Sequence, residues 1–184
     1  MPKVKEIVAG RRGRVRNSAV AGVFLLLLIV TVRAMDRPPP PPGSGEEASG
    51  EAEVFFVADG DTVRARWEGR KEWFRLLRID TPEKDEEGYR ESRRELALMV
   101  EERIVSVVFE VPGAPERDDY GRLLAYLVLD GRNVNVEMVR AGWSPFWTRY
   151  GKGRFAEKFR RAEAEAREAG RGLWGRREGG KVRR

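Results

Sequence analysis

The stretch WFRLLRIDTPE, residues 73–83, decides the fold expected of this chain. Its first half is apolar enough for a buried strand, yet Arg75 stands in the middle of it, and arginine is seldom buried without a partner. Pro82 excludes a helix and marks a turn, so Asp80 and Glu83 lie close together where the strand ends. The stretch therefore predicts one of two things. Either a cation and two carboxylates meet at a functional site, or an interior arginine–aspartate pair lies beside a helix-capping residue.

The composition narrows the possible chemistry. A length of 184 residues suits one domain of ordinary size with attachments. The chain contains no cysteine, which excludes disulfides and thiol catalysis, and no histidine, which removes the usual general base and the usual zinc ligand. Carboxylates, arginines, tyrosines and hard metal ions that prefer oxygen ligands are left to carry any reaction.

The net charge of +6 belongs to the beginning of the chain. Up to residue 34 a single acid, Glu6, stands against the basic residues Lys3, Lys5, Arg11, Arg12, Arg14, Arg16 and Arg33. This excess equals the net charge of the whole chain, so residues 35–184 are neutral. A general argument from basicity to nucleic acid fails here, and any phosphate binding must be local.

Residues 1–34 are predicted to be a signal peptide or a membrane anchor that contains a hydrophobic helix. The uncharged run at 17–32 would span about 24 Å as a helix, short of the roughly 30 Å bilayer core. Small residues flank Arg33 and permit cleavage, whereas snorkelling of Arg16 and Arg33 would let the segment span. Both alternatives stay open, and both predict an exported protein that is secreted or membrane-anchored with an extracytoplasmic domain.

The regions flanking the folded unit are low in apolar residues. Residues 35–53 are predicted to be a linker rich in proline, glycine and glutamate, because such a composition cannot bury a core. Residues 176–184 are predicted to be a basic, disordered tail. The folded domain is expected at residues 54–175.

The apolar pattern of that domain predicts an α+β fold that is mainly a β-barrel. Strands are predicted at 54–58, 62–67, 73–79, 104–111 and 122–129, and helices at 88–102, at 134–141 and over a last stretch with Phe155, Phe159, Ala162, Ala166 and Ala169 on one face. Asp59-Gly60 is a strong turn signal between the first two strands. Three strands, a helix, two strands and then helices predict a five-stranded OB-fold barrel capped by about three helices.

Three motifs at ordered spacing resemble one known family. They read Asp-Gly-Asp-Thr at 59–62, Phe-Arg-Leu-Leu-x-Ile-Asp-Thr-Pro-Glu at 74–83 and Asp-Tyr-Gly-Arg-x-Leu-Ala-Tyr at 119–126. The chain resembles the thermonuclease (staphylococcal-nuclease-like) family over about residues 54–175. The closing Ala-Arg-Glu-Ala-Gly-Arg-Gly-Leu-Trp at 166–174 also resembles the last helix of that family.

The resemblance implies a role for eight residues. Asp61, Asp80 and the backbone carbonyl of Thr81 would bind Ca²⁺, Arg75 and Arg122 would hold the scissile phosphate, Glu83 would be the general base or water-orienting group, and Tyr120 and Tyr150 would contact the nucleotide. General chemistry agrees, because arginine forks and a metal ion stabilise the negative charge of a phosphodiester transition state. A carboxylate must activate the water in a chain without histidine.

The chain departs from the family pattern at the substrate-binding positions. Residues 84–87 are acidic where the family is often rich in lysine, Asp119 stands where lysine is common, and Thr148 stands where a second tyrosine is expected. The attraction to polyanions should therefore be weak and steeply dependent on salt.

The sequence thus predicts an exported, monomeric, calcium-dependent nuclease for DNA and RNA, with single strands preferred. The alternative is a catalytically silent OB-type binding module for nucleic acid or protein, tethered at the cell surface. Glu83 argues against the alternative, because a protein that only binds has no need of a general base.

Overall fold

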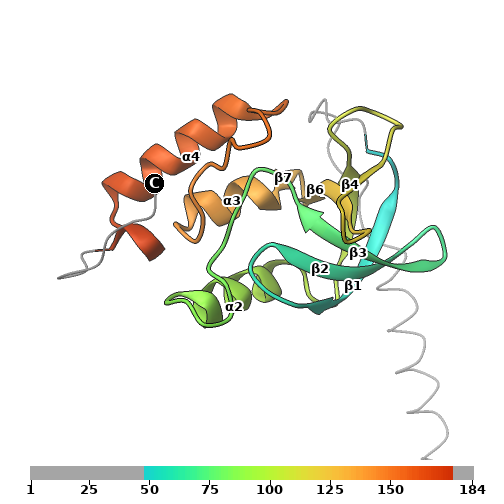
Figure 1. The fold of residues 1–184 in the computed structure, drawn as a ribbon, viewed down its shortest axis with the longest axis horizontal. Coiled ribbons are helices and arrows are strands. Elements are labelled where there is room, and N and C mark those ends of the chain that lie inside the picture. The colour runs from blue at the N-terminus through green and yellow to red at the C-terminus, as the bar shows by residue number, and fades with distance from the viewer. Residues whose placement is uncertain (1–47, 176–184) are drawn as a thin grey trace, which may run out of the picture. The chain divides into compact units, whose positions relative to one another are not determined.

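The structure, a computed structural model, describes residues 48–175 (Figure 1). The predicted leader, most of the predicted linker and the predicted tail lie outside these residues, so the division of the chain into these segments stays a prediction. Among the helices of the described part, none is both long and apolar enough to cross a membrane.

The described elements alternate between strands and helices along the chain. In chain order they are β1 (Glu51–Val57), β2 (Thr62–Trp67), β3 (Arg70–Leu76), α2 (Tyr89–Val100), β4 (Ile104–Val108), β5 (Glu116–Arg117), β6 (Leu123–Leu129), β7 (Arg132–Asn133), α3 (Val134–Arg140), α4 (Ala156–Glu168) and the 3₁₀ helix η1 (Gly172–Trp174). In Figure 1 the strands β1–β4 lie on the right and the three α-helices on the left.

The sheet closes on itself. The strands follow the order β3-β2-β1-β4-β6 with antiparallel pairs, and β3 then pairs in parallel with β6. The two-residue strands β5 and β7 add to β6. This confirms the predicted α+β fold with a five-stranded OB-type barrel and three helices.

β1 and β3 both begin three residues earlier than predicted, and β3 ends at Leu76 rather than at residue 79. β1 begins at Glu51, where buried Ala52 alternates with exposed glutamates, a charge pattern that composition alone assigned to the linker. β3 begins at Arg70 rather than residue 73. The reason is a two-residue turn: Glu68 and Gly69 both have positive φ, which is the geometry of a tight hairpin that pairs Trp67 with Arg70.

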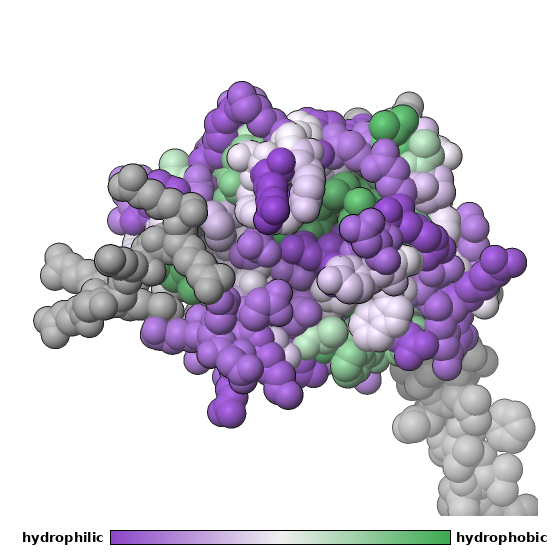
Figure 2. Space-filling model, in the orientation of Figure 1, coloured by the Kyte–Doolittle hydropathy of each residue, from purple (hydrophilic) through white to green (hydrophobic). Residues whose placement is uncertain are grey.

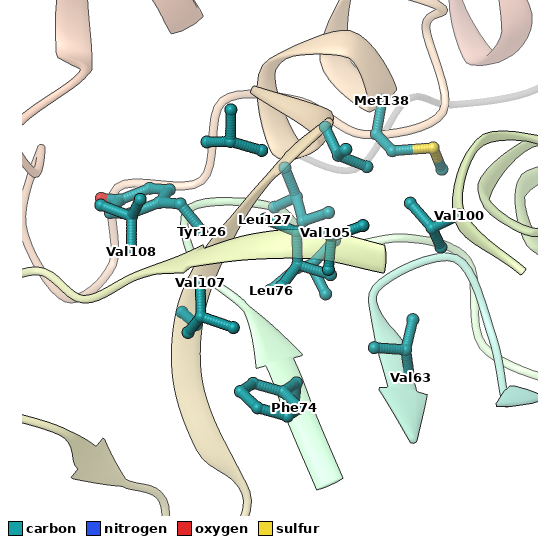
Figure 3. Close-up of a cluster of buried hydrophobic side chains, with 14 of the residues drawn as sticks. Val63, Phe74, Leu76, Val100, Val105, Val107, Val108, Tyr126, Leu127 and Met138 are labelled. Carbon is teal, nitrogen blue, oxygen red and sulfur yellow. The ribbon is translucent and has the colours of Figure 1, made fainter. Parts of the chain in front are cut away.

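The barrel interior is apolar and continuous with the helices. Figure 3 shows Phe74 and Leu76 of β3 beside Val107 of β4 and Leu127 of β6, with Met138 of α3 near them. The alternation of buried and exposed residues along each strand places one apolar face inward.

One buried amide attaches α3 to the barrel. The side-chain N–H₂ of Asn135 donates to the carbonyls of Leu77 at 2.9 Å and Ala125 at 3.1 Å, and its carbonyl oxygen accepts from the N–H of Leu127 at 3.1 Å. A buried polar group costs free energy unless it is hydrogen-bonded, and Asn135 is satisfied on both sides. It thereby holds the segment after β3, which carries the predicted site, against β6.

Candidate active site

Three separate segments bring the predicted site residues to one end of the barrel. Asp61 ends the turn between β1 and β2, Arg75 lies near the end of β3, and Arg122 immediately precedes β6. The pairing of β2 with β3 places Thr62 opposite Arg75, and the parallel pairing of β3 with β6 places Arg75 opposite Leu124. Barrel closure therefore brings together residues around β2 and β3 and residues around β6, two regions that are far apart in the sequence.

Asp61 is buried and accepts hydrogen bonds at both carboxylate oxygens. Its Oδ2 accepts from the backbone N–H and the hydroxyl of Thr81, both at 3.0 Å. Its Oδ1 accepts from the hydroxyl of Thr62 at 3.0 Å and lies 3.2 Å from the Nε of Arg75. The carboxylate is thus fixed between two predicted site residues, and it bridges the turn after β1 to the turn after β3.

Arg75 is held between two carboxylates. Besides the contact with Asp61, its Nη2 lies 3.4 Å from Oδ1 of Asp80, and its Nη1 donates to the carbonyl of Leu76 at 2.6 Å. The guanidinium carbon also lies 5.8 Å from the ring centroid of Trp147. Arg75 is therefore paired, as its position in an apolar strand requires. The two alternatives predicted for this stretch, an interior arginine–aspartate pair and a cation beside carboxylates at a site, both apply to Arg75.

Arg122 is oriented by a residue that sequence analysis did not single out. Its Nε donates to Oδ2 of Asp118 at 2.7 Å, and its Nη1 donates to the hydroxyl of Thr62 at 3.3 Å. Oδ1 of Asp118 also accepts the backbone N–H groups of Tyr120 and Arg122, at 3.1 and 2.9 Å. Burial of Asp118 acts to raise the pKa of its carboxyl group, but the hydrogen bonds and the charge of Arg122 outweigh it. The pKa of Asp118 is therefore lowered.

The carboxylates of Asp59 and Asp80 each interact with that of Asp61, and the like charges repel one another. Burial first, then the charge of Asp61, raises the pKa of Asp59 to about 6. Burial also raises the pKa of Asp80, with the charge of Asp61 acting in the same direction and that of Arg75 against it. A bound cation would relieve this repulsion.

The donor chemistry suits a hard metal ion. Within residues 48–175 no three histidine, cysteine, aspartate or glutamate side chains form a metal-binding group. The predicted set needs only two carboxylates, those of Asp61 and Asp80, together with the backbone carbonyl of Thr81. These are oxygen donors of the kind that Ca²⁺ accepts, with water completing the shell, so the residues fit such an ion.

Glu83 and the two tyrosines lie at the rim of the site. Glu83 is exposed, and its backbone N–H donates to Oε2 of Glu86 at 3.0 Å. Among the described interactions, none joins the Glu83 carboxylate to the other site residues. Tyr120 is exposed, with its ring centroid 5.4 Å from the guanidinium carbon of Arg122, and Tyr150 is exposed and packs edge-on against Trp147.

Hydrogen bonds and ion pairs connect five of the eight predicted residues, Arg122 by way of Thr62, and the structure adds three residues that were missed. Asp61, Asp80, Thr81, Arg75 and Arg122 form one network. The added residues are Thr62, which links the two arginines through Asp61, Asp118, which orients Arg122, and Trp147, which lies against Arg75. Thr62 and Asp118 lie within or next to the quoted motifs, so only their roles were hidden. Trp147 lies in no quoted motif, although the family resemblance implies aromatic residues near 143–150.

A comparison with known families agrees with this geometry. The profile described as "Staphylococcal nuclease homologue" matches residues 73–176, more than half of the chain. The chain belongs to the staphylococcal nuclease family. The match includes Arg75, Asp80, Glu83 and Arg122, whereas Asp61 lies before it. Membership of the staphylococcal nuclease family supports a nuclease hydrolase.

Relatives in bacteria share part of their length with this chain. An "Uncharacterized endonuclease" of Escherichia coli is 34% identical over 122 residues, 66% of this chain and 74% of that protein. "Endonuclease YncB" of Bacillus subtilis (strain 168) is 30% identical over 124 residues, 63% of this chain and 57% of that protein. An uncharacterized protein of Bacillus anthracis is 29% identical over 137 residues, 67% of this chain and 60% of that protein. The chain therefore spans less than two thirds of the last two relatives.

Proposed function

We propose that this protein is a calcium-dependent nuclease that hydrolyses phosphodiester bonds in DNA and RNA, with single strands preferred. The observation that carries the proposal is the convergence of Arg75 and Arg122 beside the carboxylates of Asp61 and Asp80. The Thr62 hydroxyl contacts both Asp61 and Arg122, so the two cations share one anchoring point. The names of the Escherichia coli and Bacillus subtilis relatives, both endonucleases, support the same reaction class.

The two arginines are suited to hold a phosphate. Each is tied to a carboxylate through its Nε, Arg75 to Asp61 and Arg122 to Asp118, which fixes the direction of its fork. The Nη2 of Arg122 makes no hydrogen bond within the described residues and remains available to an anion. A planar fork matches two phosphate oxygens, and the charge on these oxygens grows in the transition state.

Asp61, Asp80 and the carbonyl of Thr81 would hold the metal ion. When bound, Ca²⁺ would neutralise charge on the phosphate and lower the pKa of a coordinated water. Arg75 now balances both carboxylates, at 3.2 and 3.4 Å. Its guanidinium becomes available to substrate once Asp61 and Asp80 have another counter-ion.

Glu83 is the proposed general base. Its carboxylate takes a proton from the attacking water, whose oxygen forms a bond to phosphorus. The bond from phosphorus to the leaving sugar oxygen breaks, and that oxygen takes a proton from solvent water and departs as an alcohol. The chain has no histidine to do this, and the exposure of Glu83 leaves its carboxylate accessible to water. A positioned base of this kind contributes roughly 10²–10⁴-fold to the rate.

One observation favours the second candidate, a catalytically silent OB-type binding module. In the described part of the chain, no interaction connects the Glu83 carboxylate with the arginines or with Asp61 and Asp80. A module of this type would keep the basic network for binding and have no use for the base.

Incubation of the full chain with labelled single-stranded DNA separates the two candidates. We expect cleavage with Ca²⁺ and none with chelator. The variant Glu83→Gln should bind the strand but not cut it, and the matched control Asp85→Asn, on the same exposed loop, should cut normally. Binding without cleavage by the unaltered chain in any divalent ion would support the binding module, and full activity in chelator would refute the metal assignment.

A further inference from the structure

The outward side of the β1–β2–β3 meander carries an unusual set of side chains. On β3 the residues Phe74 and Leu76 are buried in the barrel, so Lys71, Trp73 and Arg75 lie on the opposite, outer side. This outer side therefore continues directly from Arg75 of the candidate active site along the same strand.

An irregularity in β1 exposes two aromatic residues in succession. The register between β1 and β2 shifts between Val54 and Phe56, which is a β-bulge. Phe55 and Phe56 are consequently both exposed, at 37% and 41%, and Trp73 across the sheet is 37% exposed. Phe56 and Trp73 pack edge to face with ring centroids 6.1 Å apart.

Two cations lie among these rings. The guanidinium carbon of Arg64 lies 5.3 Å from the ring centroid of Trp73 and 5.9 Å from that of Phe55, and the Nζ of Lys71 lies 5.7 Å from that of Phe55. The Nε of Arg64 is buried and has no hydrogen-bond partner within residues 48–175. An acceptor from outside cannot reach this buried Nε, so a phosphate would meet the terminal Nη atoms of Arg64, which are not among the buried unpaired atoms of these residues.

We call Phe55, Phe56, Arg64, Lys71 and Trp73 the aromatic–cationic face. Hydrophilic side chains cover most of the described surface visible in Figure 2, and hydrophobic ones show there only in separate areas. Exposed aromatics that stand together on such a surface mark an interaction site. Aromatic rings interleaved with cations are the combination that binds single-stranded nucleic acid, with bases on the rings and phosphates on the cations.

The sheet register joins this face to the candidate active site. Phe56, Arg64 and Trp73 lie opposite one another across the three strands, and Thr62 and Arg75 form a neighbouring pair on the same side. Trp73 lies two positions before Arg75, about 7 Å along β3. A nucleic-acid chain whose phosphate is held at Arg75 therefore passes over the Trp73 ring if it follows the direction of β3.

We propose that the aromatic–cationic face binds the single-stranded nucleotides that flank the phosphate held at Arg75. This inference rests on the proposed nuclease function and adds a substrate-binding surface to it. Bases stack on Trp73 and on the two phenylalanines, while Arg64 and Lys71 pair with phosphates. Duplexes bind less well, because the faces of their bases are already stacked within the helix.

Binding to labelled single strands tests this surface directly. Fluorescence anisotropy would measure the affinity of the full chain for strands of about 4 and about 16 nucleotides, in Ca²⁺ and with Glu83→Gln in every variant to suppress cleavage. Loss of one stacked base costs about 1–3 kcal/mol, so Trp73→Ala should weaken binding of the longer strand about 5- to 150-fold. Trp73→Phe should retain most of the affinity. Leu98→Ala, at a residue of α2 that is 67% exposed, is the control and should change nothing.

A second variant keeps the test decisive if Trp73→Ala does not fold. Lys71→Gln alters only an exposed side chain and should lower the salt dependence of binding by about one phosphate contact. An unchanged salt slope in Lys71→Gln would overturn the inference. So would unchanged affinity in a folded Trp73→Ala variant, or equal losses in Trp73→Ala and Leu98→Ala. An unchanged salt slope or an unchanged affinity would indicate that the aromatic–cationic face binds a protein partner instead.

The cleavage assay distinguishes this inference from the function on which it rests. If the unaltered chain cuts single strands and Trp73→Ala binds them normally, the aromatic–cationic face is wrong and the nuclease stands. If the chain cuts nothing but binds strands in a way that depends on Trp73, the face stands and the nuclease is wrong.

Discussion

The Nε of Arg75 lies 3.2 Å from the Oδ1 of Asp61, and both side chains are largely buried, with 14% and 9% of their surface exposed. Asp61 immediately precedes β2, and the register of β2 with β3 places the next residue, Thr62, opposite Arg75. Removing one partner of such a pair leaves the other charge buried and uncompensated. The ion pair therefore supports the fold and orients the site at once, so variants must be chosen to separate the two effects.

Arg75→Lys and Arg122→Lys should each reduce turnover, by about 10²–10³-fold, because lysine keeps the charge but cannot grip two phosphate oxygens. Steady-state kinetics on a single-stranded substrate would measure the effect, and circular dichroism would check the fold. Arg132→Lys, at an exposed arginine that pairs with Glu137, is the control. Normal turnover in both site variants would exclude bidentate phosphate binding.

Glu83→Gln should lower turnover by about 10²–10⁴-fold with little change in stability, because Glu83 is exposed and acts only on the attacking water. Asp85→Asn, at an exposed residue of the same loop, is a better control than a change at Glu86. Glu86 is less suitable, because its Oε2 accepts the backbone N–H of Glu83 and so shapes the loop. An equal loss in Asp85→Asn and Glu83→Gln would show that the base has been misplaced.

Asp118→Asn should lower turnover less than Arg122→Lys does, because Asp118 acts through the orientation of Arg122. The variant should also change how stability depends on pH. The pKa of Asp118 lies below its ordinary value of 3.8 in the folded protein. Its contribution is therefore complete above about pH 4 and is lost as the pH falls through the folded value.

The free energy of unfolding, measured by urea titration between about pH 7 and pH 2.5, checks this pH dependence. The difference between the unaltered chain and Asp118→Asn should stay constant down to about pH 4 and then shrink. A difference that grows on acidification would contradict the assignment.

Calcium should raise the midpoint of thermal unfolding, because a ligand that binds only the folded state stabilises it. Asp80→Asn should abolish this stabilisation while leaving the metal-free protein folded, because the Asp80 side chain is half exposed. Asp61 is unsuitable for this test, because it also accepts hydrogen bonds from Thr62 and Thr81. An equal calcium response in Asp80→Asn would show that Asp80 is no ligand.

Export is proposed from residues 1–34, whose basic residues precede an apolar run. Fractionation of cells that produce the chain with a tag after residue 184 should find the domain outside the cytoplasmic membrane. A membrane-bound product of full length would indicate an anchor, and a released product that begins near residue 35 would indicate a cleaved signal peptide. A cytosolic domain would refute export.

Sequence alone predicted the strands and helices well because their signals are local. Alternation on β2, the Asp59-Gly60 turn and the spaced alanines of α4 each reflect the geometry of a few neighbouring residues. Boundaries were less accurate, as at the start of β3, where the Glu68-Gly69 turn lengthens the strand toward its N-terminal end. The charged beginning of β1 was assigned to the linker because composition does not reveal pairing with β2 and β4.

The sequence by itself determined the OB-type barrel and the types of residue that carry the proposed chemistry. Asp61, Arg75 and Arg122 lie in short motifs at strand ends, and Asp80 and Glu83 lie in the segment that follows β3. Only the tertiary structure decided which of these charges meet. Asp61 contacts Thr81, 20 residues later, and Arg122 reaches Thr62, 60 residues earlier. The physical reason is that strand register and barrel closure, which depend on the packing of the whole apolar core, set these distances.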